Sequence, residues 1–364
     1  MSRTTARGRL LLTLVTLALA GCASTSKEVA QPPIAQSVPE IAPEVTRHRP
    51  TSLQVDDLLA EHASAPPPVG FEDYIDYAHD GVFAWTQGIV EGTDHRFADK
   101  TKDLDPVPAA PFRVGLSVES VDRSDGLDLS LDAEFDIQLK LPNIQKRLSL
   151  FVTSDTLDEA PREAGEDTNL SAGLRYALFE NLDFDVGVKF EIRPVAFTSL
   201  KWKNDYKLGK WDFHPYIKLF LESDDGLGLS SAATFDRWWG RELFRTSSYG
   251  KWLVDSNKVK WTQSLVYAHV SEQLELRSSA QYAEGRDIGR GWGARLLAEA
   301  EQTGAVTYYE AGVFFRWPSK SHWLFWYVEP LVRWDRDYNW SGDAGIRIGV
   351  DALFWDLARS GKSE

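Results

Sequence analysis

The sequence predicts an all-β fold, a transmembrane up-and-down antiparallel β-barrel preceded by a short helical N-terminal segment. Two observations lead to this prediction. Residues 127–141 alternate between apolar and polar side chains without exception, and similar alternation returns in further segments up to residue 356. Because successive side chains of a strand point to opposite faces, each such segment forms a ribbon with one apolar and one polar face. Most of these segments are joined by short turns, which is typical of antiparallel neighbours.

The segment 127–141 shows the pattern most clearly. It is longer than the usual strand of about 5–6 residues, and at roughly 3.3 Å per residue and a tilt near 45° it can cross a bilayer. A soluble sandwich would produce the same alternation, with its apolar face packed in a core. Strand length favours the membrane, and so does tryptophan, which prefers membrane–water interfaces. Of the 14 Trp residues, 13 lie between Trp202 and Trp355.

Fifteen candidate strands can be drawn between residues 112 and 356, among them a separate strand at 273–284. Barrels made from a single bacterial chain have an even number of strands, so one of the fifteen assignments has to be wrong. We therefore predict about fourteen strands, with twelve and sixteen as alternatives. The barrel is expected to occupy residues 111–356, followed by a tail at 357–364.

The N-terminus has the features of an export signal over residues 1–21. Three arginines precede a short apolar run that is too short to span a membrane as a helix. The sequence Leu19-Ala20-Gly21-Cys22 resembles the lipobox of bacterial lipoproteins. The resemblance implies cleavage before Cys22 and acylation of that cysteine, for example with palmitate, and Ala23 implies sorting to the outer membrane. The alternative is a plain signal peptide with an incidental cysteine, although Cys22 is the only cysteine in the chain.

Two segments separate this signal from the barrel. Residues 22–50 are rich in Ala, Pro, Ser and Thr, and we expect them to form an acylated flexible tether. Residues 51–110 are expected to be helical, because apolar residues recur at helical spacing from Phe71 to Val90. Amphipathicity leaves two positions open for this helix. It is either a periplasmic helix on the base of the barrel or a plug inside the lumen.

Composition restricts the partners. The chain has 54 acidic residues against 40 Lys and Arg, giving a net charge of −14, and removing the three arginines of the signal brings the mature chain near −17. Nucleic acid is therefore not expected as a partner, because phosphate binding relies on Lys and Arg. We expect outer-membrane lipids as partners, and a periplasmic protein is a further candidate partner for residues 51–110. After the signal there is no run of 18 apolar residues, so no transmembrane helix is expected.

If the apolar faces meet lipid, charged side chains line the lumen. The selected candidates are Asp128, Asp132, Glu134, Asp136, Lys201, Lys203, Arg333 and Arg347. Two interpretations stay open, since charge content does not reveal pore width. One is a porin-like channel with charged walls, and the other is a non-conducting structural or partner-docking barrel filled by ion pairs.

One motif raises the question of catalysis. His269-Val270-Ser271 resembles the His-x-Ser arrangement of outer-membrane lipid hydrolases, in which both side chains face lipid. Such a site also needs an Asn, Asp or Glu that orients the histidine. The expected neighbouring strand 273–284 offers none on its outward face, so we predict that the chain is not an enzyme. No metal-ligand spacing and no nucleotide-binding fingerprint occurs in the sequence, and no cofactor is expected.

A second resemblance concerns the barrel itself. Leu141-Pro142-Asn143 with the segment 147–151 (Arg-Leu-Ser-Leu-Phe), preceded by an aromatic helix, is similar to a family of uncharacterised Gram-negative outer-membrane proteins. The similarity begins near Phe71. It implies a barrel and brings no catalytic residues with it.

Overall fold

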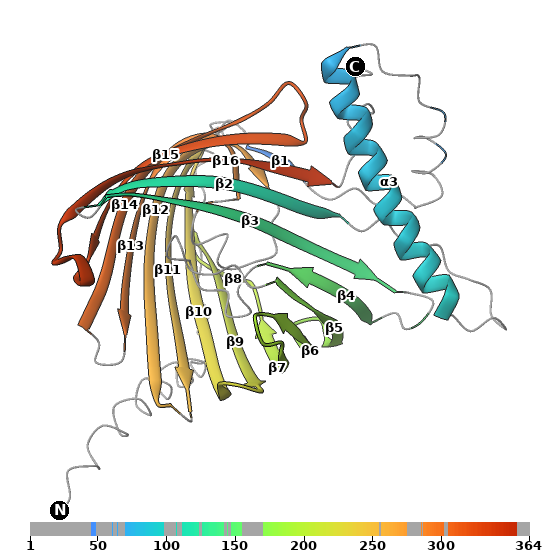
Figure 1. Ribbon diagram of the computed structural model, residues 1–364, viewed down its shortest axis with the longest axis horizontal. Coiled ribbons are helices and arrows are strands. Elements are labelled where there is room, and N and C mark those ends of the chain that lie inside the picture. Colours follow the sequence, from blue (N-terminus) through green and yellow to red (C-terminus); the bar gives the residue numbers. More distant parts are fainter. Residues whose placement is uncertain are drawn as a thin grey trace, which may run out of the picture. The chain divides into compact units, whose positions relative to one another are not determined.

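The computed structural model (Figure 1) describes residues 45–48, 60, 64, 70–97, 107, 111–123, 126–141, 144, 147–154, 170–254, 256–274, 285, 287–301 and 305–354. The signal segment, Cys22 and the tail at 357–364 lie outside the described residues. The expectations for cleavage and acylation therefore remain predictions.

Fourteen strands form a closed antiparallel barrel, and this confirms the predicted fold class and strand number. Neighbours along the chain pair with each other, β7 pairs with β9, and β16 pairs with β2 to close the wall. The wall strands are β2 (Phe112–Arg123), β3 (Gly126–Lys140), β4 (Leu148–Thr153), β5 (Leu170–Phe179), β6 (Leu182–Phe190), β7 (Val195–Lys203), β9 (Trp211–Glu222), β10 (Gly226–Trp239), β11 (Glu242–Leu253), β12 (Lys258–Leu274), β13 (Ile288–Glu301), β14 (Ala305–Pro318), β15 (Leu324–Asp335) and β16 (Gly342–Phe354).

Three short elements accompany the wall. β8 (Tyr206–Leu208) pairs with β9, and the 3-10 helix η1 (Arg336–Tyr338) lies between β15 and β16. β1 (Thr46–His48) pairs in parallel with the last residues of β12, so the range expected to be a tether contains a strand. No wall strand separates β12 from β13, as the expected strand at 273–284 would, because β12 itself continues to Leu274 and pairs directly with β13; residues 275–284 lie outside the described residues.

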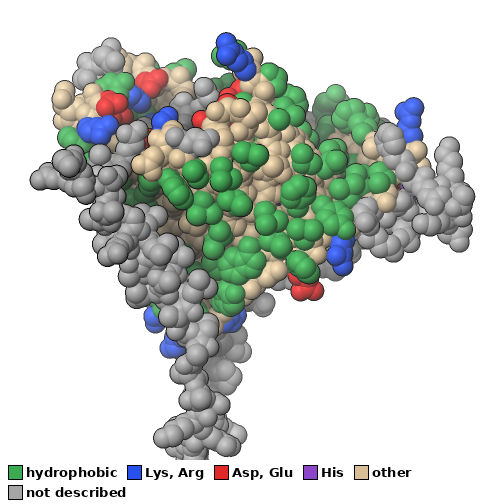
Figure 2. All heavy atoms as spheres, turned by 90° about the horizontal axis from the view of Figure 1, so that it is seen from below, with side chains coloured by type: hydrophobic (Ala, Val, Ile, Leu, Met, Phe, Trp, Pro, Cys, Tyr) green, Lys and Arg blue, Asp and Glu red, His purple; other side chains and the backbone are tan. Residues whose placement is uncertain are grey.

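The two faces of the wall differ as the alternation predicts. On β3, Leu127, Leu129 and Leu131 are 71%, 67% and 70% exposed, whereas Glu134 on the opposite face is buried. Other strands repeat this arrangement, and Figure 2 shows apolar side chains spread over the outer surface of the wall. The leucine face of β3 therefore points outward and its acidic face points inward.

Glycine and aromatic residues face each other across neighbouring strands on the inner face. Five glycines lie directly opposite an aromatic residue, and a Cβ added at any of them would come within 3 Å of the opposing ring. The pairs are Gly173 with Phe151, Gly187 with Phe197, Gly228 with Phe220, Gly293 with Phe314 and Gly349 with Tyr327. Each ring occupies the space that a side chain would take, so glycine is required at these strand positions.

The helix α3 (Phe71–Phe97) begins at the predicted residue and continues beyond Val90. Phe83 packs on Phe112 of β2 and Phe354 of β16, with Val114 and Ile137 at the edge of this cluster. Within their strands these four wall residues occupy outward-facing positions, because they alternate with inward-facing residues. The helix therefore lies against the outside of the wall, near the end of the barrel where β2 begins and β16 ends. The plug interpretation does not hold for α3.

Candidate functional site

Three arginines and three glutamates form a buried cluster on the inner face of β13, β14, β15, β16 and β2. The six residues, which we call the central cluster, are Glu119, Arg295, Glu310, Glu329, Arg333 and Arg347, and each is at most 6% exposed. They alternate along their strands with exposed apolar residues such as Val118 and Ile348, which shows that they lie on the inner face. Their formal charges sum to zero, which is the arrangement that buried charges require.

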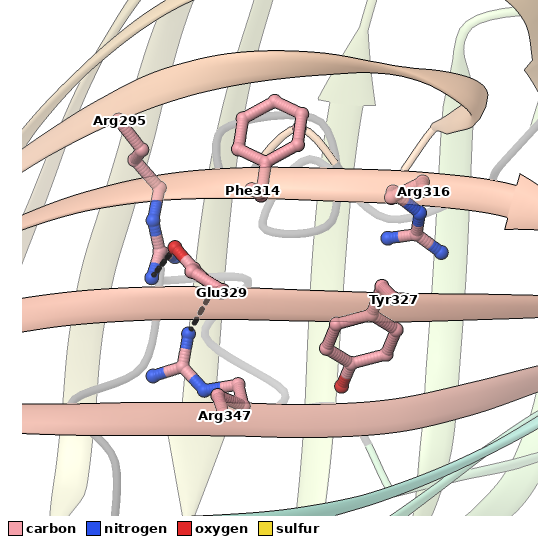
Figure 3. Close-up of a pocket in the computed structure, with 7 residues that line it drawn as sticks. Arg295, Phe314, Arg316, Tyr327, Glu329 and Arg347 are labelled. Atoms are coloured by element: carbon pink, nitrogen blue, oxygen red, sulfur yellow. Dashed lines mark hydrogen bonds and ion pairs between the residues drawn. The ribbon is translucent and has the colours of Figure 1, made fainter.

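Shared contacts connect all members of the central cluster. Arg347 donates to Glu119 at 2.9 Å and to Glu329 at 2.7 Å. Arg333 joins Glu119 to Glu310, with distances of 2.7 and 2.8 Å. Arg295 joins Glu310 to Glu329, and its Nη2 lies 3.0 Å from the Glu329 carboxylate. Figure 3 shows Glu329 between Arg295 and Arg347. Each carboxylate therefore contacts at least two guanidinium groups.

A second group of charges lies closer to the end of the barrel where β2 begins and β16 ends. Asp351 accepts from Arg113 Nε at 3.1 Å and also binds Arg316. The other side of Arg113 lies 3.3 Å from Glu134 of β3. In this group the two arginines balance the two carboxylates in formal charge. Together the two groups place ion pairs along six adjacent strands, from β13 around to β3.

Arg245 on β11 is the centre of a third group and is completely buried. It binds Asp236 of β10 at 2.7 and 2.6 Å and Asp287 at 2.6 and 3.0 Å. Gln273 also donates to Asp287 at 2.9 Å. Asp287 directly precedes β13, so this arginine ties the start of that strand to the inner face of β10 and β11.

A small cavity lies beside the central cluster. It is lined by Gly285, Arg295, Phe314, Arg316, Tyr327, Glu329 and Arg347. The space open to the centre of a water molecule is about 20 Å³, enough for about one water. In Figure 3, Phe314 and Tyr327 project beside the guanidinium groups. The described side chains therefore leave a narrow space on this side of the interior.

Strands β4 to β12 carry hydroxyl groups on their inner surface, beside further ion pairs such as Arg175 with Asp185 and Lys189 with Glu222. Thr234 and Ser247 share a hydrogen bond of 2.7 Å. Four other hydroxyls have no hydrogen-bond partner among the residues that the structure describes, and they belong to Ser171, Ser199, Ser230 and Thr262. All four residues are at most 3% exposed. A buried hydroxyl without a partner is unfavourable by about 1–3 kcal/mol.

The predicted charged residues of the lumen all occupy inward-facing positions of their strands, in very different surroundings. Glu134, Arg333 and Arg347 belong to the ion-pair groups above. Lys201 is buried with its ammonium 5.0 Å from the centre of the Tyr216 ring, and Lys203 lies 3.5 Å from Asp183. On β3, Asp132 and Asp136 are half-buried. Asp128, with a side chain that is 53% exposed, lies 3.2 Å from Arg123.

The candidates selected from the sequence did not include Glu119 and Arg113 of β2. The signal was nevertheless present. Phe112, Val114, Leu116 and Val118 alternate with Arg113, Ser117 and Glu119 in the pattern of the other strands. The pairing of β2 with β16 then places Glu119 directly opposite Arg347.

The catalytic candidate His269 has a carboxylate partner, but it is not hydrogen-bonded to the other candidate, Ser271. His269 Nδ1 lies 2.7 Å from Glu242 Oε1, its direct neighbour on β11. This orienting carboxylate was missed because the search considered the strand expected at 273–284. Ser271 makes no hydrogen bond with His269, and it lies at a register shift of β12. A nucleophile–base pair is therefore not formed.

The described residues contain no group of three or more His, Cys, Asp and Glu placed to hold a metal ion. No helix among them is long and apolar enough to cross a membrane.

Comparison with known proteins adds little to this description. No protein-family model matches the chain, and no curated protein matches it. Among solved structures, Pseudomonas aeruginosa OccK5 (OpdH) is similar at 10% identity with a TM-score of 0.39, covering 67% of this chain and 97% of its own. P. aeruginosa OccK2 (OpdF) is similar at 9% identity with a TM-score of 0.39, covering 67% of this chain and 96% of its own. P. aeruginosa OpdQ is similar at 11% identity with a TM-score of 0.36, covering 67% of this chain and 97% of its own. At these values the similarity carries no statement about function, and the barrel assignment rests on the strand pairing.

Proposed function

We propose that the chain is an outer-membrane barrel that provides a narrow, hydrated passage for small polar solutes. The observation that supports this most is the opposite character of the two wall faces. The outer face exposes Leu, Val, Ile, Phe and Trp side chains, whereas the inner face carries charged and hydroxyl groups. A soluble barrel would have its apolar face inside, so this arrangement suits a wall surrounded by lipid.

The inner wall between β5 and β12 carries hydroxyl groups that suit a polar passage. Ser171, Ser199, Ser230 and Thr262 lie on four different strands in this range, so hydroxyl groups extend around this part of the inner wall. On the other side, the central cluster narrows the interior with fixed charges of both signs. A solute in such a passage meets hydroxyl groups together with guanidinium, ammonium and carboxylate groups. Small polar or charged solutes fit this chemistry.

A non-conducting barrel is the second candidate, and a separate observation favours it. Near the end of the barrel where β2 begins, apolar side chains fill part of the interior. One cluster includes Leu243, Val266, Ile288 and Phe314, and another joins Leu274 to Phe325 and Leu353. Because the second cluster joins residues from three separate strands, it restricts any route at that end.

Planar-bilayer conductance of the purified, folded protein separates the two candidates. We expect small, discrete current steps. The double substitution Arg347→Ala with Glu329→Ala keeps the charge balanced and removes two large side chains beside the cavity, so the steps should become larger. Leu129→Ala on the outer face is the matched control and should leave them unchanged. No current from either the natural protein or the double variant would reject the passage and support the structural barrel.

We further propose that Cys22 is acylated and anchors the chain to the outer membrane, as the lipobox implies. Metabolic labelling with palmitate should mark the natural chain and leave the variant Cys22→Ala unlabelled. Labelling of neither protein would contradict the anchor without affecting the barrel. A lipid-hydrolase function gains no support, because Ser271 makes no hydrogen bond with His269. We expect no release of fatty acid from phospholipid vesicles that contain the folded protein.

A further inference from the structure

The helix α3 exposes apolar residues along one side. Between Tyr74 and Gly92 its exposed positions are Tyr74, Ala78, Val82, Trp85, Ile89 and Gly92, which follow one another at intervals of three or four residues. We call this row the α3 strip. Tyr74 and Trp85 are 63% and 68% exposed, and Val82 and Ile89 are each 47% exposed. The strip contains no charged residue.

The buried side of α3 contains Phe83, Ala84 and Val90, but most of its residues are polar. Asp76, His79, Asp80, Gln87 and Asp94 are each at most 4% exposed. A helix at a water interface normally has the reverse arrangement, with its apolar side on the protein and its polar side in solvent. The orientation of α3 therefore suits an apolar environment outside the protein.

Specific contacts fix this orientation. The carboxylate of Asp76 accepts hydrogen bonds from Ser321 Oγ at 2.6 Å and from Trp323 Nε1 at 3.0 Å. His79 Nε2 lies 2.9 Å from the carbonyl oxygen of Leu353. The His79 ring also stacks on Trp323 and Phe354, at centroid distances of 4.2 and 4.6 Å. Rotating the helix to hide the α3 strip would break all of these contacts.

The position of α3 indicates what covers the strip. Phe83 rests on Phe112 and Phe354, which are outward-facing residues of β2 and β16. The next outward positions on these two strands include Leu116, Val118 and Ile348, which are 46%, 43% and 47% exposed. The helix thus rests on the same apolar face that we propose to contact lipid. Tyr and Trp on the strip are the residue types that prefer the membrane–water interface.

We infer that α3 is an interfacial membrane helix whose strip inserts into the phospholipid leaflet at this end of the barrel. The inference rests on the proposed membrane location of the barrel. A helix of 27 residues is about 40 Å long, so α3 would lie along the leaflet surface. Its exposed charged residues lie towards the two ends, where Glu72 pairs with Lys320 and Arg96 is exposed. These charges can remain at the level of the lipid headgroups.

Site-specific fluorescence quenching tests the inference. Because Cys22 is the only cysteine, the full mature chain with Cys22→Ser accepts single cysteines at Val82→Cys or Trp85→Cys on the strip. Leu131→Cys on the outer wall serves as the membrane reference, and Lys210→Cys in an exposed turn serves as the aqueous reference. Each variant is labelled with bimane and folded into phosphatidylcholine vesicles with either ordinary or brominated acyl chains.

We expect brominated lipid to quench the labels at 82 and 85 at least half as strongly as the label at 131, and aqueous iodide to quench mainly the label at 210. Quenching at 82 and 85 by iodide, with bromine quenching only at 131, would overturn the inference and leave the barrel in the membrane. Protection of 82 and 85 from both quenchers would also overturn it, because another protein surface would then cover the strip. Absence of bromine quenching at 131 would instead reject the membrane location itself.

Discussion

Arg347 Nε donates a hydrogen bond of 2.9 Å to Glu119, and this contact joins the last strand of the barrel to the first. The two residues are directly opposite in the pairing of β16 with β2. Arg347 also reaches Glu329 on its other side, so it connects three adjacent strands. Closure of the barrel therefore brings together charges that are 228 residues apart in the sequence.

Removing Arg347 should destabilise the barrel strongly. Arg347→Gln leaves Glu119 and Glu329 buried with less positive charge, and loss of one partner from a buried ion pair lowers the free energy of unfolding by about 3–5 kcal/mol. Urea unfolding in lipid vesicles, followed by tryptophan fluorescence, measures the change. The matched control is Arg336→Gln, whose side chain is 51% exposed, and it should change stability by less than about 0.5 kcal/mol. If both variants lowered the free energy of unfolding equally, the central cluster would not stabilise the closure of the barrel between β16 and β2.

The leucine face of β3 gives a test of the membrane assignment. Leu131→Arg should lower the free energy of unfolding in vesicles by about 2–4 kcal/mol if Leu131 lies near the bilayer midplane. Leu127→Arg, one residue from the start of the same strand, should cost only about 0–1 kcal/mol because its charge can reach the interface. The two leucines are almost equally exposed, so the comparison isolates depth in the membrane. Similar small effects of both substitutions would argue against lipid on this face.

The alternation along each strand was sufficient to predict the barrel and which side chains share a face, and the even number of strands in such barrels reduced the fifteen candidates to about fourteen. It could do so because a strand carries its pattern locally, with a period of two residues. The exception was 273–284, where polar and apolar residues also alternate and no local signal shows that β12 continues to Leu274 before β13 begins. That error concealed the neighbour of His269, because Glu242 lies on the strand before it and not on the strand expected after it.

The contacts between side chains on the inner face could not be predicted, because they depend on the register of neighbouring strands and on how the barrel closes. Arg333 and Arg347 could be placed on the inside by parity, but their shared partner Glu119 comes from the opposite end of the barrel sequence. The position of α3 was equally hidden. Its apolar spacing left open whether it lies on the base of the barrel or in the lumen, whereas the contacts of Asp76, His79 and Phe83 place it against the outside of the wall. Hydrophobic periodicity finds a helix but does not identify the surface on which it rests.

The Gly228 and Phe220 pair provides a test of packing on the inner face. Gly228→Ala would place a methyl group within 3 Å of the Phe220 ring, so the ring has to move. Such overpacking should lower the free energy of unfolding by about 1–3 kcal/mol. Gly250→Ala is the matched control on the neighbouring strand, where the closest atom to a new Cβ is 4.0 Å away. This control should be neutral or slightly stabilising, and a loss equal to that of Gly228→Ala would mean that strand flexibility, not the ring, decides the effect.

Arg245 supplies the last prediction, because its guanidinium satisfies two carboxylates at once. Its Nε and Nη2 bind Asp236, and its Nη1 and Nη2 bind Asp287. Lysine keeps the charge but cannot form this planar set of contacts, so Arg245→Lys should lower the free energy of unfolding by about 1.5–3 kcal/mol. Arg245→Met, which leaves two buried carboxylates without a cation, should cost about 3–5 kcal/mol. The control Arg290→Lys alters an arginine near the same end of the barrel whose side chain is 59% exposed and 4.0 Å from Glu272, and a change below about 0.5 kcal/mol is expected. If Arg245→Lys were as stable as Arg290→Lys, charge alone would hold Asp287 in place and the planar set of guanidinium contacts would be unnecessary.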